Sequence, residues 1–362
     1  LAQLASRLRE GRARLDKYSV DDLIALVAGA ARRWASPDSP LLPLRQQGLL
    51  FLTGWCESRS FRSMADRSLH GQRGFLDGFR ALNGTNRRLM RAQPRGLVAH
   101  WLAGNVPLLG MLALAQSIVT RNANLLKAAS SFSRVLPALL DGFRGLEVRC
   151  ADGRILHGDD VLASIAVVYF NREDTAAAEQ LSALADVRLA WGGREAIETI
   201  LNLPKRYGTE DIIFGPKLSF MVIGREAIAS PRLLRRTARQ AATDSSVFDQ
   251  YACASPHTIF VEKGGAVSPR EFAAALAAEM AKAAIRIPKG PVDAGTAAKV
   301  ESLRIRYEFT GELWRSPGTE WTVLYDEDAG AGLAPPCYSR VITVRAIDDA
   351  LAAAQFAHSG IQ

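Results

Sequence analysis

The sequence contains few cysteines, and its histidines show no pattern, so two kinds of site are excluded at once. Only four cysteines occur in 362 residues, with no short paired spacing, which argues against a disulfide framework and against a zinc site. The five histidines lack ligand spacing as well, so we predict no metal. Free thiols suit a reducing compartment, and we expect a cytoplasmic protein. The cysteines are Cys56, Cys150, Cys253 and Cys337.

The chain also lacks an apolar run of the length that a membrane crossing needs. Its longest run, 106–120, is interrupted by Gln116 and Ser117 and is shorter than the roughly 20 residues of a spanning helix. No signal peptide is visible. We therefore expect no membrane span.

Composition and charge are those of an ordinary globular protein. Hydrophobic residues make up 48% of the chain and charged residues 23%, and the length suggests about two domains of roughly 150 residues. The net charge is +8. Because acids interrupt the positive charges along the whole chain, we predict no nucleic-acid partner. A phosphorylated ligand and an arginine-rich proteome explain the charge equally well.

Helices dominate the first part of the chain. Ser19 precedes an apolar-periodic segment that runs through Ala30, with acids in its first turn, as is typical of a capped helix. The patterns at 41–55 and 66–82 predict two more helices. No residue in this part indicates catalysis.

From Leu97 onward, short apolar strands alternate with helices. The strand 97–102, the helix 107–119 and the strand 124–128 form one βαβ unit. The series continues with elements at 164–170, 173–185, 187–191 and, as its last strand, 218–223. This alternation predicts an α/β fold with a doubly wound parallel sheet, whose ligands bind at the carboxyl ends of the strands.

The remainder of the chain predicts more elements of the same kind. Ser268 and Glu271 form a capping box with proline at the first helical position, and the helix continues through Ala284. A strand is expected at 341–344 and a helix at 347–356.

One cysteine stands at the mouth of a buried strand. Cys253 lies in the segment 249–256, and the apolar strand 257–262 follows directly. A thiol is the best side-chain nucleophile near neutral pH once its surroundings lower a pKa that starts near ~8.5. Cysteine is also among the most buried residue types, so a packing role is the alternative.

Three further positions lie at strand ends of the predicted sheet. Asn105 follows the first strand, Lys127 ends the second, and Gly192-Gly193 follows another strand and opens a helix whose amides can face a phosphate. Alone, each has an ordinary explanation as a helix cap, a surface charge or a turn. Together with Cys253 they define a candidate site.

The order of these segments resembles the aldehyde dehydrogenase superfamily. The motifs are Asn105-Val106-Pro107, the run 122–127, Trp191-Gly192-Gly193 and Cys253 before a strand. Within the superfamily the chain is most similar to the long-chain acyl-CoA reductases of the bacterial bioluminescence (LuxC) type. That similarity rests on the segments 100–105, 189–196 and 249–256 and spans roughly residues 90–350.

The resemblance implies an aldehyde-dehydrogenase-like fold of two doubly wound α/β domains with a helical N-terminal part. Residues 1–225 would hold the N-terminal helices and an NADP-binding Rossmann-like domain, and 226–362 the catalytic domain with the thiol. The chain ends at Gln362, earlier than the superfamily implies, so we expect the C-terminal tail to be missing, disordered or shortened. Analogy also predicts a homodimer.

The resemblance assigns roles to the candidate site. Cys253 would attack an activated acyl group as a thiolate, while its own N–H and the Asn105 amide hold the oxyanion. Lys127 is similar to a lysine that binds the adenosine ribose, and Trp191-Gly192-Gly193 to the loop beneath the pyrophosphate. NAD-preferring relatives carry an acid three residues after that lysine. Here Ser130 takes its place and cannot repel a 2′-phosphate, so we expect NADPH.

Two departures from the superfamily matter for the reaction. Ile213 stands where aldehyde-oxidising relatives carry the glutamate that activates water. Without that base, we expect an acyl-CoA (acyl-thioester) reductase that forms a fatty aldehyde, with coenzyme A or a partner protein carrying the acyl group. The glutamate that binds the nicotinamide ribose has no clear counterpart near 334–337, so no residue is assigned to that task.

Other functions stay open. An aryl thioester, a short-chain thioester or an acyl phosphate would be an alternative substrate, and a non-catalytic scaffold an alternative role. A Cys-His acyltransferase or peptidase would need His257, but residues four apart on a strand lie about 13 Å apart, too far to hydrogen-bond.

Four arginines fall on one face of a predicted helix at i, i+3, i+4 and i+7 spacing. Coenzyme A phosphates or an acidic acyl-donor protein would fit them, although a solvated face is the expected explanation. They are Arg232, Arg235, Arg236 and Arg239.

Overall fold

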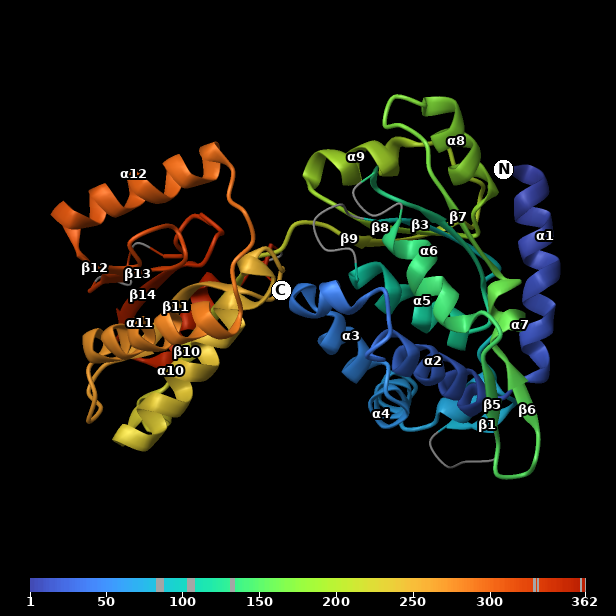
Figure 1. The fold of residues 1–362 in the computed structure, drawn as a ribbon, viewed down its shortest axis with the longest axis horizontal. Helices are drawn as coiled ribbons and strands as arrows, with labels where there is room; N and C mark the ends of the chain where they lie inside the picture. The colour runs from blue at the N-terminus through green and yellow to red at the C-terminus, as the bar shows by residue number, and fades with distance from the viewer. Residues whose placement is uncertain are drawn as a thin grey trace. The chain divides into compact units, whose positions relative to one another are not determined.

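The structure, a computed structural model, describes residues 1–82, 88–102, 108–130, 134–327, 330, 332–358 and 360–361, without the side chains of Gln46, Gln47 and Leu109. The chain forms two compact units, Leu1–Gly215 and Pro216–Gln362 (Figure 1). The division lies before the boundary expected at residue 225.

Helices form the N-terminal part of the first unit. They are α1 (Ala2–Arg12), α2 (Val20–Trp34), α3 (Leu49–Trp55) and α4 (Ser58–Ser68). The Ser19 hydroxyl accepts a hydrogen bond from the Asp22 N–H, and the Asp22 carboxylate accepts one from the Ser19 N–H. This capping box confirms the predicted start of α2.

Two helices predicted in this part differ from the structure. The segment 41–55 is divided by Gly48, whose φ of 96° separates the short 3-10 helix η2 (Leu42–Gln47) from α3. The helix predicted at 66–82 is wrong, because α4 ends at Ser68 and His70 and Gly71 have φ of 52° and 82°. The elements η3 (Arg73–Leu76), β1 (Arg80–Ala81) and β2 (Leu89–Met90) follow.

Five parallel strands in the order β7-β4-β3-β8-β9 form the main sheet of the first unit. This sheet confirms the predicted doubly wound α/β architecture. The strands are β3 (Leu97–Trp101), β4 (Ala123–Lys127), β7 (Ile165–Val168), β8 (Val187–Trp191) and β9 (Glu210–Phe214). The other α-helices and strands are α5 (Leu109–Val119), α6 (Val135–Leu140), β5 (Glu147–Arg149), β6 (Ile155–His157), α7 (Gly158–Leu162), α8 (Thr175–Leu184) and α9 (Arg194–Asn202).

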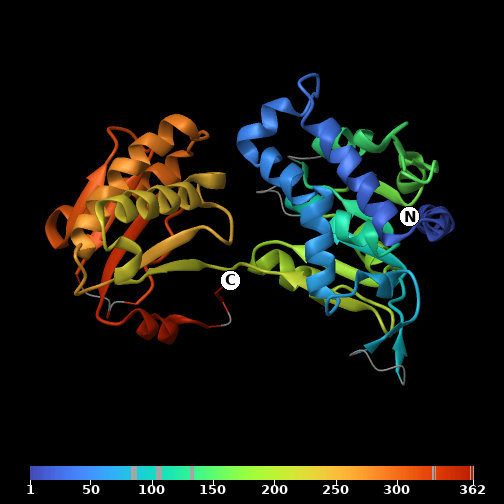
Figure 2. The ribbon, with the colours of Figure 1, turned by 90° about the horizontal axis from the view of Figure 1, so that it is seen from below.

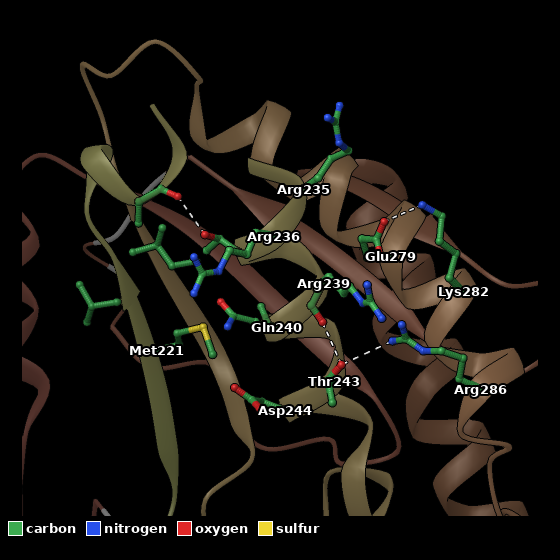
Figure 3. Close-up of a pocket in the computed structure, with 15 residues that line it drawn as sticks. Met221, Arg235, Arg236, Arg239, Gln240, Thr243, Asp244, Glu279, Lys282 and Arg286 are labelled. Carbon is green, nitrogen blue, oxygen red and sulfur yellow. Dashed lines mark hydrogen bonds and ion pairs between the residues drawn. The ribbon is translucent and has the colours of Figure 1, made fainter. Parts of the chain in front are cut away.

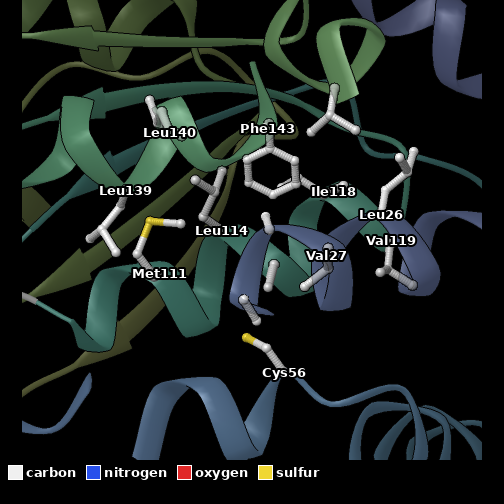
Figure 4. Close-up of a cluster of buried hydrophobic side chains, with 14 of the residues drawn as sticks. Leu26, Val27, Cys56, Met111, Leu114, Ile118, Val119, Leu139, Leu140 and Phe143 are labelled. Atoms are coloured by element: carbon white, nitrogen blue, oxygen red, sulfur yellow. The ribbon is translucent and has the colours of Figure 1, made fainter. Parts of the chain in front are cut away.

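Apolar side chains cover both faces of this sheet. Leu126 points into a cluster with α2, α5 and α6, part of which Figure 4 shows around Phe143 and Met111. Leu125 points into the opposite cluster, against α1, α8 and α9. Neighbouring residues of one strand enter different cores because successive side chains point to opposite faces.

The second unit is built on a sheet in the order β10-β11-β14-β13-β12, of which β12 alone runs antiparallel to its neighbour. Helices α10 and α11 pack on one face and α12 on the other (Figures 1 and 2). The strands are β10 (Ser219–Ile223), β11 (Pro256–Glu262), β12 (Glu312–Arg315), β13 (Thr322–Asp326) and β14 (Val341–Ile347). The helices are α10 (Pro231–Ser246), α11 (Pro269–Arg286) and α12 (Ala294–Thr310).

Two predictions for this half of the chain need correction. The strand expected to close the first sheet, 218–223, is β10, which pairs with β11 in the second sheet. The strand at this edge of the first sheet is β9. Its residues alternate between exposed and partly buried, so it lacks the continuous apolar run by which the other strands were predicted. The helix expected at 347–356 is a shorter 3-10 helix, η10 (Ala350–Phe356), because Ile347 still belongs to β14. The Ser268 capping box of α11 is confirmed.

Among the helices of the described residues, none combines the length and the apolar character that a membrane crossing requires.

Candidate active site

Two of the predicted positions meet at the carboxyl edge of the first sheet. Lys127 ends β4 and Trp191 ends β8, and these two strands flank β3. In the register, Trp101 at the end of β3 pairs with Lys127 on one side and with Ala190 on the other. Parallel strands end at a common edge, so Lys127 and the turn after β8 lie around the end of β3.

Lys127 is half-buried at this edge. Its Nζ lies 5.4 Å from the centre of the Phe170 ring, within cation–π range. Desolvation lowers its pKa from the ordinary value. Over the described residues its ammonium enters no ion pair. Ser130, three residues later, is exposed.

Trp191 is held flat against the next strand. Its ring stacks on Phe214 with 3.9 Å between centroids and 11° between planes, and the Gly192 N–H donates to the Phe214 carbonyl at 3.2 Å. The indole Nε1 of Trp191 is buried and has no acceptor in the part of the chain that the structure describes. Buried donors normally have a partner, so an acceptor on a bound ligand would complete this site.

Gly193 is the N-cap residue of α9, with extended dihedrals of −68° and 168° and no capping side chain. A Cβ at Gly193 would meet no described atom within 4 Å, whereas one at Gly192 would lie 3.2 Å from the Cβ of Ala196. There is therefore room beside Gly193, at the N-terminal end of α9, where the free N–H groups of a helix attract an anion.

Asn105, the predicted oxyanion donor, lies outside the described residues. Its role stays a prediction from the sequence.

Cys253 belongs to the second unit, on the loop between the 3-10 helix η8 (Val247–Gln250) and β11. The residue is half-buried. Its carbonyl accepts a hydrogen bond of 2.7 Å from the hydroxyl of Ser219, the first residue of the neighbouring strand β10. This bond fastens the loop to the edge of the sheet.

A buried amide holds the ends of the same loop. The Gln250 side chain is fully buried and donates to the carbonyls of Pro256 and Val341, each at 2.8 Å. Its carbonyl oxygen accepts from the Val341 N–H at 2.9 Å. Gln250 therefore ties the residues on both sides of Cys253 to strand β14.

Asp249, which precedes Gln250, is held by an ion pair with the buried Arg340. The Asp249 carboxylate accepts two hydrogen bonds from Arg340, at 2.8 and 2.5 Å, and one from the Gly290 N–H at 2.9 Å. Phe248, Asp249 and Gln250 all have left-handed φ, between 52° and 67°. Such conformations cost roughly 1 kcal/mol or more at each non-glycine residue, so the ion pair and the amide hold a strained approach to the thiol.

Desolvation raises the thiol pKa of each of the other three cysteines. Burial raises the pKa of the Cys56 thiol to about 12, and Cys56 packs in the apolar cluster of Figure 4. Desolvation also raises the pKa of Cys150 and of Cys337. A raised pKa lowers the fraction of reactive thiolate.

His257 takes no part in a dyad with Cys253 in the described structure. Its ring packs edge-on against Tyr338, with 5.1 Å between centroids. Burial lowers its pKa to about 4. His257 is a packed residue of β11.

The sequence interpretation missed the residues that support the site. Ser219, Asp249, Gln250 and Arg340 received no role, and Phe214 was not recognised as the platform for Trp191. Asp249 and Gln250 lie in the segment 249–256, and the resemblance of that segment to the family was the one available signal.

Solved structures define the class to which this fold belongs. A benzaldehyde dehydrogenase from Corynebacterium glutamicum matches with a TM-score of 0.60 at 13% identity, over 98% of this chain and 77% of that protein. An indole-3-acetaldehyde dehydrogenase from P. syringae matches with 0.65 at 15%, over 98% and 74%. An acetylating aldehyde dehydrogenase from Geobacillus thermoglucosidasius gives 0.63 at 14%, over 98% and 77%. The chain has the aldehyde dehydrogenase fold.

Within that class, the sequence identifies the family. The family model described as acyl-CoA reductase (LuxC) matches residues 15–362, and the chain belongs to this family.

Curated relatives share part of their length with this chain. A long-chain acyl-protein thioester reductase of Vibrio harveyi is 29% identical over 242 residues, covering 66% of this chain and 46% of that protein. One of Photorhabdus luminescens is 34% identical over 175 residues, covering 47% and 33%. The chain thus matches less than half the length of these relatives.

Proposed function

We propose that this chain reduces an acyl thioester to an aldehyde, with Cys253 as the nucleophile and NADPH as the reductant. The LuxC family match over residues 15–362 carries the proposal. The names of the relatives specify an acyl-protein thioester, so the donor is an acyl group on a protein or on coenzyme A.

The Cys253 thiolate attacks the acyl carbonyl, and the bond to the donor sulfur breaks. The donor leaves as a free thiol and the acyl group stays on Cys253 as a thioester. Hydride addition to that carbonyl gives a thiohemiacetal, which collapses to the aldehyde and restores the thiolate. The N–H of Cys253 and the amide of Asn105 are the proposed donors to the oxyanion, each contributing about 3 kcal/mol.

The edge of the first sheet suits a nicotinamide dinucleotide, which supplies the hydride when bound. The half-buried ammonium of Lys127 faces the adenosine ribose in this proposal, and the amides at Gly193 face the pyrophosphate. The unpartnered Trp191 Nε1 supports a ligand acceptor at this edge. The exposed Ser130 brings no negative charge, which favours a 2′-phosphate and therefore NADPH.

Reduction is favoured over hydrolysis by the side chain at 213. Ile213 packs into the apolar cluster of α1, α8 and α9 and provides no base for activating water. An acyl group on Cys253 is therefore expected to react with hydride or with a thiol and not with water.

The test is NADPH oxidation with a panel of donors. The panel contains acyl-CoA esters from short to long, an aryl thioester and an acyl phosphate, with NADH in a parallel series. We expect thioester-dependent oxidation that prefers NADPH and a long acyl chain, and none with Cys253→Ala. Cys337→Ala is the matched control and should retain activity.

Other outcomes would reject defined parts of the proposal. A preference for NADH would remove the argument from Ser130. Oxidation with acyl phosphate alone would change the substrate class. Equal activity of Cys253→Ala would remove the thiol from the mechanism.

A further inference from the structure

The second unit carries a wide groove whose walls are cationic. It has a volume of about 1130 Å³ and lies between β10, α10 and α11 (Figure 3). Its floor is apolar, formed by Met221, Ile223 and Ala241 among others. Its charged lining consists of five cations and two acids: Arg235, Arg236, Arg239, Lys282, Arg286, Asp244 and Glu279.

The guanidinium groups of the α10 arginines that line the groove have no ion-pair partner among the described residues. Arg235, Arg236 and Arg239 are exposed, and none of them enters an ion pair or side-chain hydrogen bond with any residue that the structure describes. Arg340 of the same unit, by contrast, pairs with Asp249 at 2.5 Å. The charge on α10 is therefore available to a partner.

The second wall adds to the same field. Among the described residues, Arg286 on α11 makes one long side-chain contact, 3.5 Å, with the Thr243 hydroxyl. Figure 3 shows Arg286 and Arg239 extending into the same space from the two helices. Glu279 is buried and is neutralised by Lys282 at 2.6 Å. Of the acids that line the groove, Asp244 alone carries no ion pair within the described chain. Because five cations face two acids, the net charge of the lining is positive.

The groove is continuous with the elements that hold the thiol. Met221 lies two residues after Ser219, whose hydroxyl binds the Cys253 carbonyl. Helix α10 leads through η8 directly to the Cys253 loop. Two residues of strand span about 7 Å, so a partner seated here lies near the loop that bears the nucleophile.

We infer that this groove docks an acidic, amphipathic helix of the protein that carries the acyl group. An apolar floor between cationic walls matches a helix with one apolar and one acidic face. The volume exceeds the roughly 300–1,000 Å³ of small-molecule sites, and the opening is wide, which favours a protein over the phosphates of coenzyme A. The inference rests on the proposed function, because it names the donor for the same thiol.

The test compares a variant with reversed charges in the groove and a control variant with reversed charges on α12. The groove variant is Arg235→Glu with Arg239→Glu. The control is Lys299→Glu with Arg306→Glu, two exposed cations on α12 that also change the net charge by four. All four side chains lie on helix surfaces, so both variants should fold, which circular dichroism checks.

The probe is a small acidic carrier protein bearing a phosphopantetheine arm. Binding of its labelled, acyl-free form is followed by fluorescence anisotropy at low and at physiological salt. We expect the Kd to rise at least about tenfold in the groove variant and to stay within about twofold in the control. Salt should weaken binding of the unaltered protein and have little effect on the groove variant.

Turnover separates this inference from the proposed function. The kcat/KM for myristoyl carrier protein should fall with binding in the groove variant, while that for myristoyl-CoA should stay within about twofold. An equal loss with myristoyl-CoA would assign the arginines to the coenzyme A phosphates and overturn the docking inference. Absence of salt-sensitive binding, or an equal loss in the control, would also overturn it. If no donor supports NADPH oxidation, the proposed function fails, yet the binding measurement still decides on the groove.

Discussion

Two histidines, His100 on β3 and His257 on β11, are buried as neutral rings, one in each unit. His100 Nε2 lies 3.0 Å from the Asn124 Oδ1, and its Nδ1 has no partner among the described residues. Burial lowers the pKa of each ring from 6.5 to about 4. Unfolding frees both rings to bind protons at the ordinary pKa. The unfolded state therefore binds more protons between these values, and stability falls as the pH falls from about 6.5 toward 4.

This argument predicts a pH dependence that one substitution reduces. Between pH 7 and pH 5, protonation of His100 in the unfolded state should lower the free energy of unfolding by about 2 kcal/mol. Replacing His100 by glutamine should remove that loss, because the titrating group is gone. Urea unfolding at the two pH values, followed by fluorescence, measures it. His157→Gln, at an exposed histidine, is the control and should keep the original dependence. Equal losses in all three proteins would show that buried histidines do not set the acid side of stability.

At the scale of secondary-structure elements, the approach to Cys253 depends on an ion pair between η8 and the start of β14. Arg340 is 1% exposed and donates to Asp249 and to the Ile287 carbonyl. Removing one partner of such a pair leaves a buried charge, which costs more than the pair contributes.

Asp249→Ala should therefore destabilise the protein by about 3 kcal/mol and slow acylation of Cys253, because the left-handed segment loses its anchor. The control is Asp348→Ala. Asp348 forms an exposed ion pair with Lys263 at 3.1 Å, so its loss should lower the free energy of unfolding by less than about 1 kcal/mol. Thermal unfolding and the rate of thiol acylation measure the two effects. An Asp249→Ala protein with unchanged acylation would show that the strained segment does not position the thiol.

Local signals in the sequence predicted several elements well. Caps such as Ser19 and Ser268 are short-range features, and the strand 187–191 is a compact apolar run, so each can be recognised without tertiary information. The helix predicted at 66–82 failed because a left-handed His70 followed by Gly71 ends the helix, which apolar spacing alone does not show.

Contacts between residues far apart in the chain could not be predicted from the sequence. The apolar run of β10 is the same whichever sheet it joins, and only its register with β11 assigns it to the second unit. The same limit applies to the site. Cys253 and the strand-end positions carry visible motifs, whereas the pairing of Asp249 with Arg340, 91 residues away, exists only once β14 is in place.

At the scale of the whole molecule, each unit carries one part of the proposed chemistry. The first holds the strand edge with Lys127 and the open start of α9, and the second holds Cys253. Acylation of the thiol transfers no hydride, so it should proceed without cofactor. The homodimer stays a prediction from the superfamily resemblance.

The most direct test is the mass of the intact protein after incubation with myristoyl-CoA in the absence of NADPH. We predict a single acyl adduct that maps to Cys253, forms equally in Cys337→Ala, is absent in Cys253→Ala, and is released as aldehyde once NADPH is added. An adduct on another residue, or acylation of Cys253→Ala at the original rate, would contradict the account.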